Sequence, residues 1–84
     1  MKQVTLYTRS FCPFCLGAKQ MLGDLGVKFT EINVGNDPVK REELATKYNW
    51  PTLPMIVVGD EFIGGFDDLR TLHAEGKFLP KLVD

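Results

Sequence analysis

Cysteine and histidine are scarce in this sequence, and their scarcity limits the sites that the chain can build. The 84 residues contain two cysteines, Cys12 and Cys15, and one histidine, His73. A tetrahedral zinc site would have to complete its four ligands with carboxylates, so zinc is the less favoured use of the two cysteines. Because the sequence has no further cysteines to join in structural disulfides, we expect the chain to work in a reducing cytoplasm.

Long apolar runs and an excess of one charge are missing as well. The formal net charge is −1, which gives no reason to expect nucleic acid or an acidic surface as a partner. No run approaches the roughly 20 apolar residues that cross a bilayer, and residues 1–3 lead into the first predicted strand without the apolar segment of a signal peptide. With 84 residues, of which 44% are hydrophobic, we expect a single small domain over residues 1–84 that acts as a monomer without a membrane.

The two cysteines stand where a predicted strand gives way to a predicted helix. Residues 4–8 are β-branched and aromatic with apolar side chains in alternation, which indicates a strand. Residues 13–25 carry apolar side chains at steps of three and four, which indicates an amphipathic helix. Pro13 suits the first helical position, because a helix leaves the N–H group of that position unpaired. Cys12 is therefore expected at the amino-terminal end of the helix.

This position favours the thiolate form of Cys12. The open N–H groups at a helix start, the positive end of the helix dipole and the nearby Arg9 all stabilise a negative charge. Such surroundings lower the pKa of a cysteine from about 8.5 to roughly 3.5–7.5, and the thiolate is the reactive species. We therefore predict that Cys12 is a nucleophile and that Cys15, one helical turn away, attacks a mixed disulfide formed on Cys12. A purely structural disulfide is less favoured, because a bridge across two residues closes a small loop and constrains little.

The rest of the chain alternates between predicted helices and strands. The expected elements are a strand at 28–34, a helix at 39–48, hairpin strands at 55–58 and 61–63, a helix ended by Gly76, and a short helix at 79–83. Asp37 is the predicted N-cap of the second helix, with Pro38 at its first position, and Asp67 or Asp68 is the predicted cap of the third.

The order of these elements predicts an α/β fold. Two strand–helix units imply a parallel strand pair with a right-handed crossover, and the hairpin adds antiparallel strands. The expected result is a four-stranded mixed sheet flanked by helices on both faces. A Cys-x-x-Cys motif beside such a β-α-β pattern in a cytosolic chain is typical of thioredoxin-like redox proteins.

Four motifs together resemble the glutaredoxin family, and the resemblance covers essentially the whole chain. They are Cys-Pro-Phe-Cys at residues 12–15, Tyr-Thr-Arg at 7–9, Thr-Leu-Pro at 52–54 and Gly-Gly-Phe-Asp-Asp-Leu at 64–69. In that family the first is the redox dithiol, the second supplies a basic residue, the third contains a cis-proline and the fourth binds the γ-glutamyl end of glutathione. The resemblance implies a thioredoxin-like fold and a glutathione-dependent thiol–disulfide oxidoreductase. Its expected substrates are glutathione mixed disulfides and protein disulfides, with glutathione as co-substrate and no metal.

The resemblance also implies a glutathione site beside the two cysteines. Leu53 would pair through its backbone with the cysteinyl part of glutathione, and the N–H groups of Phe66 and Asp67 would hold the γ-glutamyl carboxylate. The Asp67 carboxylate would take up the adjacent ammonium group, and Arg9 and Arg41 would bind the glycyl carboxylate. The full set of residues assigned to glutathione is Arg9, Phe14, Arg41, Thr52, Leu53, Pro54, Gly65, Phe66, Asp67 and Asp68.

Several of these assignments leave alternatives open. Arg41 could be a surface residue of its helix, Asp68 only a helix cap, and residues 64–65 only a turn. The chain lacks the Cys-Gly-Phe-Ser motif and the insertion of monothiol glutaredoxins, but a glutathione-ligated [2Fe–2S] carrier is a second possible function. A redox protein reduced by thioredoxin reductase is a third. Met55 and Phe66 stand where the family often has glutamine and cysteine or serine, which leaves the preferred substrate open.

Overall fold

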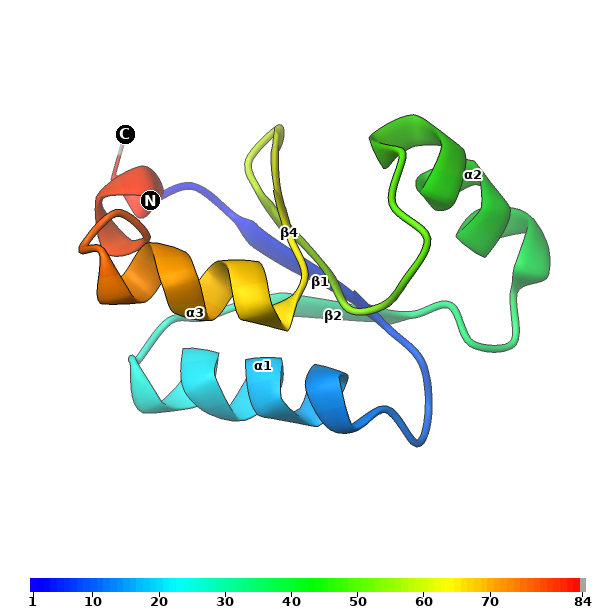
Figure 1. Cartoon of the computed structure of the whole chain (residues 1–84), viewed down its shortest axis with the longest axis horizontal. Helices are drawn as coiled ribbons and strands as arrows, with labels where there is room; N and C mark the ends of the chain where they lie inside the picture. Colours follow the sequence, from blue (N-terminus) through cyan, green and yellow to red (C-terminus); the bar gives the residue numbers. More distant parts are fainter. Residues whose placement is uncertain (84) are drawn as a thin grey trace.

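The computed structural model describes residues 1–83 and contains four strands, three α-helices and a short 3-10 helix (Figure 1). In chain order they are β1 (Val4–Thr8), α1 (Pro13–Asp24), β2 (Thr30–Asn33), α2 (Pro38–Tyr48), β3 (Met55–Val58), β4 (Glu61–Gly64), α3 (Phe66–Ala74) and η1 (Leu79–Leu82). This order confirms the predicted α/β arrangement. Within residues 1–83, no helix has the length and apolar character needed to cross a membrane.

The four strands form one mixed sheet in the order β2-β1-β3-β4. β1 pairs in parallel with β2, and it pairs antiparallel with β3, where Leu6 faces Ile56. β3 and β4 form the predicted hairpin around Gly59 and Asp60. β2 is shorter than the predicted strand at 28–34, and all four of its residues are exposed. The reason is its place at the edge of the sheet, where one side has no neighbouring strand.

The alternation of β1 and β3 divides the core into two clusters on opposite faces of the sheet. The first core cluster packs under α1, α3 and η1 and contains Val4, Leu6, Ala18, Leu22, Val27, Ile56, Val58, Leu69, Phe78 and Leu82. The second core cluster contains Cys12, Cys15, Val34, Leu44, Leu53 and Met55, with Tyr7, Ala45, Tyr48, Trp50 and Phe62 packed against it. Helices therefore pack on both faces, as predicted: α1, α3 and η1 on one, and Leu44, Ala45 and Tyr48 of α2 on the other.

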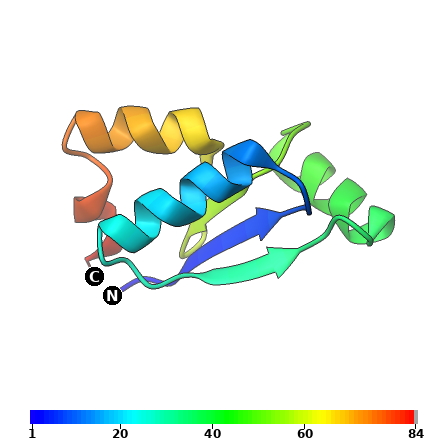
Figure 2. The same cartoon turned by 90° about the horizontal axis from the view of Figure 1, so that it is seen from below.

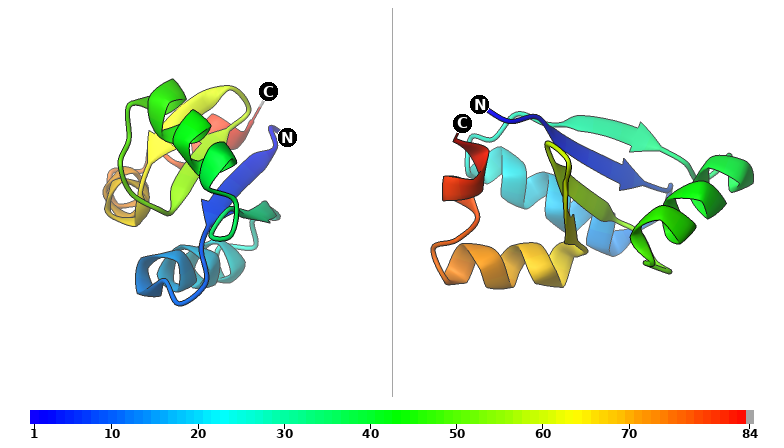
Figure 3. Two further views of the ribbon diagram at one scale, coloured as in Figure 1. Left: turned by 90° about the vertical axis from the view of Figure 1, so that its right-hand side faces the viewer. Right: turned by 90° about the horizontal axis from the view of Figure 1, so that it is seen from above.

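The pictures show how this packing places the helices. α1 and α3 lie side by side over one face of the sheet (Figure 2), and α2 lies at the end toward which β1 and β2 point (Figures 2 and 3). The loop between β1 and α1 reaches the same end of the molecule. Both cysteines are therefore presented at one end of the sheet, close to α2.

The helix ends partly confirm the sequence predictions. Asp37 is the N-cap of α2, and its carboxylate accepts a hydrogen bond from the Lys40 N–H at 3.0 Å. The predicted cap of α3 by Asp67 or Asp68 is wrong, since Gly65 is its N-cap. Asp68 is instead the third residue of the helix, and its carboxylate reaches back to accept the Gly65 N–H at 2.9 Å. The last predicted helix, at 79–83, is a 3-10 helix that ends at Leu82.

Candidate functional site

The two cysteines occupy the first turn of α1. Cys12 is the N-cap with an extended backbone, and Pro13 takes the first helical position, as predicted. The two cysteines are joined by a disulfide, with their Cα atoms 5.1 Å apart. The Cys15 N–H also donates a hydrogen bond to Cys12 Sγ at 3.1 Å. Cys12 is 8% exposed and Cys15 only 2%, so Cys12 is the sulfur that an incoming thiol or disulfide reaches more easily.

The segment that precedes β3 lies against the cysteine pair. Cys12 Sγ lies 3.9 Å from the carbonyl oxygen of Leu53, and the Leu53–Pro54 peptide bond is cis, as the family resemblance implied. Gly65 is packed close behind, because a Cβ added there would lie 3.7 Å from the Pro54 carbonyl oxygen and 3.7 Å from the Trp50 ring. Residues 52–54 are therefore the meeting point of two other segments: Leu53 contacts Cys12 at the start of α1, and Pro54 contacts Gly65 at the start of α3.

The start of α3 offers its first N–H groups beside this meeting point. Gly64 has a φ of +124°, which side chains rarely adopt, and this backbone turns the chain from β4 into the helix. Asp67 is exposed, and its carboxylate lies 3.5 Å from the Arg70 guanidinium in a surface ion pair. The carboxylate of Asp68 accepts the Gly65 N–H, so Asp68 supports the N-cap from the third helical position without being the N-cap itself.

The two candidate cations have different surroundings. The Arg9 guanidinium donates to the carbonyl oxygens of Ser10 at 3.2 Å and Phe11 at 2.9 Å, so it binds the loop that leads to Cys12. Arg41 is half-buried in the first turns of α2, and among residues 1–83 its guanidinium has no hydrogen bond or ion pair. The remaining assigned side chains, Phe14 and Thr52, are exposed next to the cysteine pair and to Leu53 in the chain. The glutathione roles of all these residues stay predictions.

Sequence reasoning missed Phe11, which is the most exposed large apolar residue of those described. Its side chain is 96% exposed, and its φ of +56° places it in the left-handed region. Phe11 and both cysteines line a cleft of about 580 Å³ on the side of α1 that faces β2. The one sequence signal was an aromatic residue directly before a Cys-x-x-Cys motif in a loop. Trp50 Nε1 was also missed: it is buried without a hydrogen-bond partner among the described residues.

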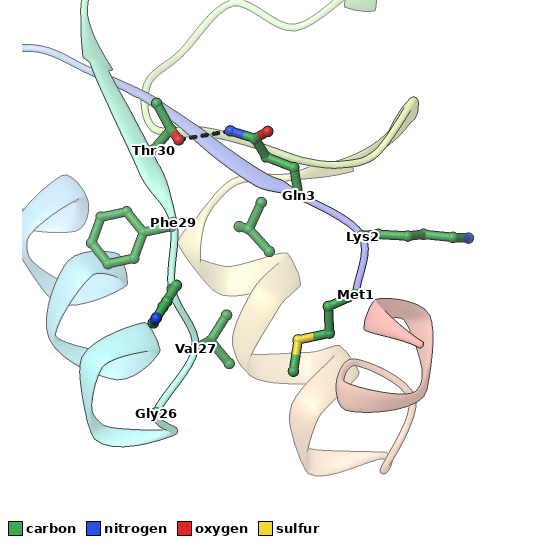
Figure 4. Close-up of a pocket in the computed structure, with 9 residues that line it drawn as sticks. Met1, Lys2, Gln3, Gly26, Val27, Phe29 and Thr30 are labelled. Carbon is green, nitrogen blue, oxygen red and sulfur yellow. Dashed lines mark hydrogen bonds between the residues drawn. The ribbon is translucent and has the colours of Figure 1, made fainter. Parts of the chain in front are cut away.

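A second cleft, of about 500 Å³, lies at the opposite end of the molecule (Figure 4). It is lined by residues 1–4 and 26–30, with Val27 and Phe29 on its wall and Gln3 hydrogen-bonded to Thr30. No cysteine and no residue assigned to glutathione lines it. Among residues 1–83, no three side chains of histidine, cysteine, aspartate or glutamate come together as a metal-ligand group.

Comparison with known protein families extends over most of the chain. The family model described as Glutaredoxin matches residues 4–63. The curated relatives include a glutaredoxin of Pseudomonas aeruginosa, 44% identical over 77 residues that make up 92% of each chain. They also include glutaredoxin 3 of Escherichia coli K12, 39% identical over 82 residues, which cover 98% of this chain and 99% of that protein.

Solved structures agree with the sequence comparison. The solution structure of a glutaredoxin from Brucella melitensis superposes with a TM-score of 0.88 at 39% identity, covering 98% of this chain and 89% of that one. The crystal structure of a buckwheat glutaredoxin–glutathione complex superposes with a TM-score of 0.91 over 96% of this chain and 76% of that one. At 23% identity it shows the shared fold alone. The family match and the joined cysteines support thiol–disulfide oxidoreductase activity. The chain therefore belongs to the glutaredoxin family, with a thioredoxin-like fold and a redox-active Cys-x-x-Cys pair.

Proposed function

We propose that this protein is a glutathione-dependent oxidoreductase that reduces glutathione mixed disulfides and protein disulfides through Cys12 and Cys15. The observation that carries the proposal is the position of residues 52–54, which contact the Cys12 sulfur through Leu53 and the start of α3 through Pro54. An extended peptide placed along residues 52–54 would have its own sulfur next to Cys12, and its end would reach the open N–H groups of α3. Glutathione is a short peptide thiol of this kind, and the buckwheat relative was crystallised as a glutaredoxin–glutathione complex.

The reaction with a glutathione mixed disulfide needs Cys12 alone. The Cys12 thiolate attacks the glutathionyl sulfur of the substrate, a Cys12–glutathione disulfide forms, and the other substrate sulfur leaves as a thiolate. The thiolate of a second glutathione then attacks the bound glutathionyl sulfur. Oxidised glutathione leaves, and the Cys12 thiolate is regenerated. In the whole cycle, one free glutathione is consumed, and the oxidised glutathione that leaves contains this molecule and the glutathionyl group of the substrate.

A protein disulfide uses both cysteines. Cys12 attacks one substrate sulfur and releases the other as a thiolate, leaving a protein–Cys12 mixed disulfide. The Cys15 thiolate then attacks Cys12 Sγ, which releases the second substrate thiolate and forms the Cys12–Cys15 disulfide that the structure holds. Two glutathiones reduce this bond in succession. Cys15 is well placed for its step, because its sulfur is bonded to Cys12 Sγ in the structure, with the two Cα atoms 5.1 Å apart.

The residues around the cysteines would bind glutathione by complementary charge. Open N–H groups at the start of α3 favour the γ-glutamyl carboxylate, and the exposed Asp67 would exchange its surface pairing with Arg70 for the glutathione ammonium group. Arg41, which has no side-chain partner among residues 1–83, and Arg9, in the loop before Cys12, would attract the glycyl carboxylate. We further propose that the protein works as a monomer in a reducing cytoplasm and needs no metal.

A coupled assay tests this function. Purified protein is mixed with glutathione, glutathione reductase and NADPH, and a glutathionylated peptide is added as substrate. We expect NADPH oxidation that depends on both the protein and glutathione, and that is abolished by Cys12→Ser. Reduction of the protein by thioredoxin reductase, with no turnover in the glutathione system, would refute the proposal.

A further inference from the structure

Phe11 lies beside the reactive cysteine in a conformation that needs support. A residue with a side chain rarely adopts a φ of +56°, because its Cβ then crowds the backbone. An aromatic ring that is 96% exposed also gains little from its own fold. Unusual backbone held next to a reactive group is a feature from which function can be inferred.

Two side chains hold this loop in place. The Arg9 guanidinium binds the carbonyl oxygens of both Ser10 and Phe11, as described above. The Asn33 amide, at the end of β2, donates to the Ser10 hydroxyl at 3.3 Å, and its own oxygen accepts the Gly35 N–H at 2.8 Å. The loop is thereby attached to the sheet edge, and the Phe11 ring is kept in the solvent.

The ring stands at the mouth of the cleft that the two cysteines share with β2. Leu16, another exposed apolar residue, lines the same cleft one turn further along α1. Arg9 and Cys12 belong both to this cleft and to the proposed glutathione site, but none of residues 52–54 or 64–68 lines the cleft. Cys12 therefore has two different neighbours, the Leu53 backbone in one direction and the cleft with Phe11 and Leu16 in the other.

The three charged side chains that line this cleft, Arg9, Lys19 and Glu31, all have partners within the fold: the Arg9 guanidinium donates to two backbone carbonyl oxygens, and the other two form an ion pair. Lys19 pairs with the Glu31 carboxylate at 3.3 Å, and the same carboxylate accepts a hydrogen bond from the buried Thr8 hydroxyl at 2.7 Å. Glutathione has no apolar side chain, so it gains little from contact with Phe11 and Leu16. A polypeptide with an apolar residue next to its disulfide matches the surface well.

We propose that Phe11 and Leu16 form a contact site for polypeptide substrates, which takes an apolar side chain adjacent to the cysteine under attack. The inference rests on the proposed function and deepens it. It names the feature of a protein substrate, an apolar side chain beside the disulfide, that the surface of Phe11 and Leu16 recognises. Arg9 and Asn33 hold Phe11 in position before the substrate arrives, which lowers the ordering cost of binding. Phe11 then determines specificity for protein disulfides. The reaction of Cys12 with a small glutathione mixed disulfide does not depend on Phe11.

The test compares two disulfide peptides that are identical except for leucine or serine beside the first cysteine. Pre-reduced protein is mixed with each peptide in the absence of glutathione, and formation of the Cys12–Cys15 disulfide is followed by acid quench and mass spectrometry. The same is done with the mixed disulfide of glutathione and cysteamine, following the glutathione adduct. The variants are Phe11→Asn, in which asparagine tolerates a positive φ, Phe11→Tyr, which keeps the ring, and Val83→Asn. Val83 is the matched control, because it is 67% exposed and lies at the opposite end of the chain.

We expect wild-type protein to react faster with the leucine peptide than with the serine peptide. Phe11→Asn should lower the leucine-peptide rate constant by roughly three- to tenfold, the effect of losing one aromatic contact, and should leave the cysteamine disulfide unchanged. Phe11→Tyr should retain most of the leucine-peptide rate, and Val83→Asn should change neither rate.

Two results would overturn the inference. One is an equal loss on all three substrates, which would mean that Phe11 supports the reactivity of Cys12 itself. The other is an unchanged leucine-peptide rate in Phe11→Asn. A failure of the glutathione proposal is separate: wild-type protein would then not react with the cysteamine disulfide, while the leucine peptide would still depend on Phe11.

Discussion

Gly64→Ala gives a test of how the start of α3 is built. Gly64 has a φ of +124°, and a Cβ added there would lie 2.6 Å from the Asp68 Oδ2 and 2.7 Å from its Cγ, both too close for real atoms. The variant must therefore either adopt a disfavoured backbone, which costs about 1–3 kcal/mol, or move the turn. It must also displace the carboxylate that caps the Gly65 N–H, and losing such a cap costs about 1 kcal/mol.

We expect Gly64→Ala to lower the free energy of unfolding by about 3 kcal/mol, a large part of the 5–15 kcal/mol typical of small domains. Urea denaturation followed by circular dichroism measures it as a fall in the midpoint without a change in slope. Gly23→Ala is the matched control. Gly23 lies in α1 with no atom within 4 Å of an added Cβ, so this variant should have a free energy of unfolding about 0.5–1 kcal/mol higher than the wild-type protein.

A double mutant separates the two causes. In an Asp68→Ala background the contacts with Oδ2 and Cγ and the cap are already removed, and a 3.0 Å contact with the Cβ of residue 68 remains, so Gly64→Ala should cost less there than in the wild-type protein. A loss below about 1 kcal/mol for Gly64→Ala in the wild-type background would refute this reasoning, because the backbone cost alone exceeds it. Equal effects of Gly64→Ala and Gly23→Ala would refute it as well.

Three further predictions follow from the same site. The pKa of the Cys12 thiol in the reduced protein should lie below about 7, because the open end of α1 stabilises its thiolate; an alkylation midpoint near the free-cysteine value of about 8.5 would contradict this. Asp67→Ala should raise the KM for glutathione up to about fivefold with a smaller change in kcat, since exposed charged contacts contribute about 1 kcal/mol or less, and Asp24→Ala at the far end of α1 should change neither. Phe11→Gly should raise the free energy of unfolding by about 1 kcal/mol in urea denaturation, because glycine adopts a φ of +56° without the crowding of a Cβ; a loss of stability would show that the ring contributes to the fold.

Local patterns in the sequence were enough to predict the redox pair and the sheet. Neighbouring residues alone indicate a β-branched strand, then Cys12 and Pro13, and then an amphipathic helix. The structure confirms this order. The N-cap of α3 was predicted at Asp67 or Asp68 because aspartate is a common N-cap residue. In the structure Gly65 is the N-cap, and Asp68 binds its N–H from the third helical position. The cis bond before Pro54 was reached through the family resemblance and not from the residues.

The surroundings of Phe11 could not be predicted, because they depend on contacts between distant segments. Asn33 is 23 residues from Ser10, and only the folded sheet brings the two together. The exposure of β2 depends in the same way on its place at the sheet edge, since the alternation of residues 28–34 resembles that of a half-buried strand. The glutathione roles of Arg9, Arg41 and Asp67 stay predictions that the kinetic experiments test.

The most direct test of the central claim compares Cys12→Ser with Cys15→Ser on a glutathionylated peptide, in the assay coupled to glutathione reductase. Cys12→Ser should abolish activity, because no other thiolate can begin the exchange. Cys15→Ser should retain deglutathionylation, lose most of its reduction of protein disulfides, and gain the mass of one glutathione as a stable adduct on Cys12. If Cys15→Ser loses deglutathionylation as completely as Cys12→Ser, the one-cysteine cycle is wrong, and the protein requires both cysteines for every substrate.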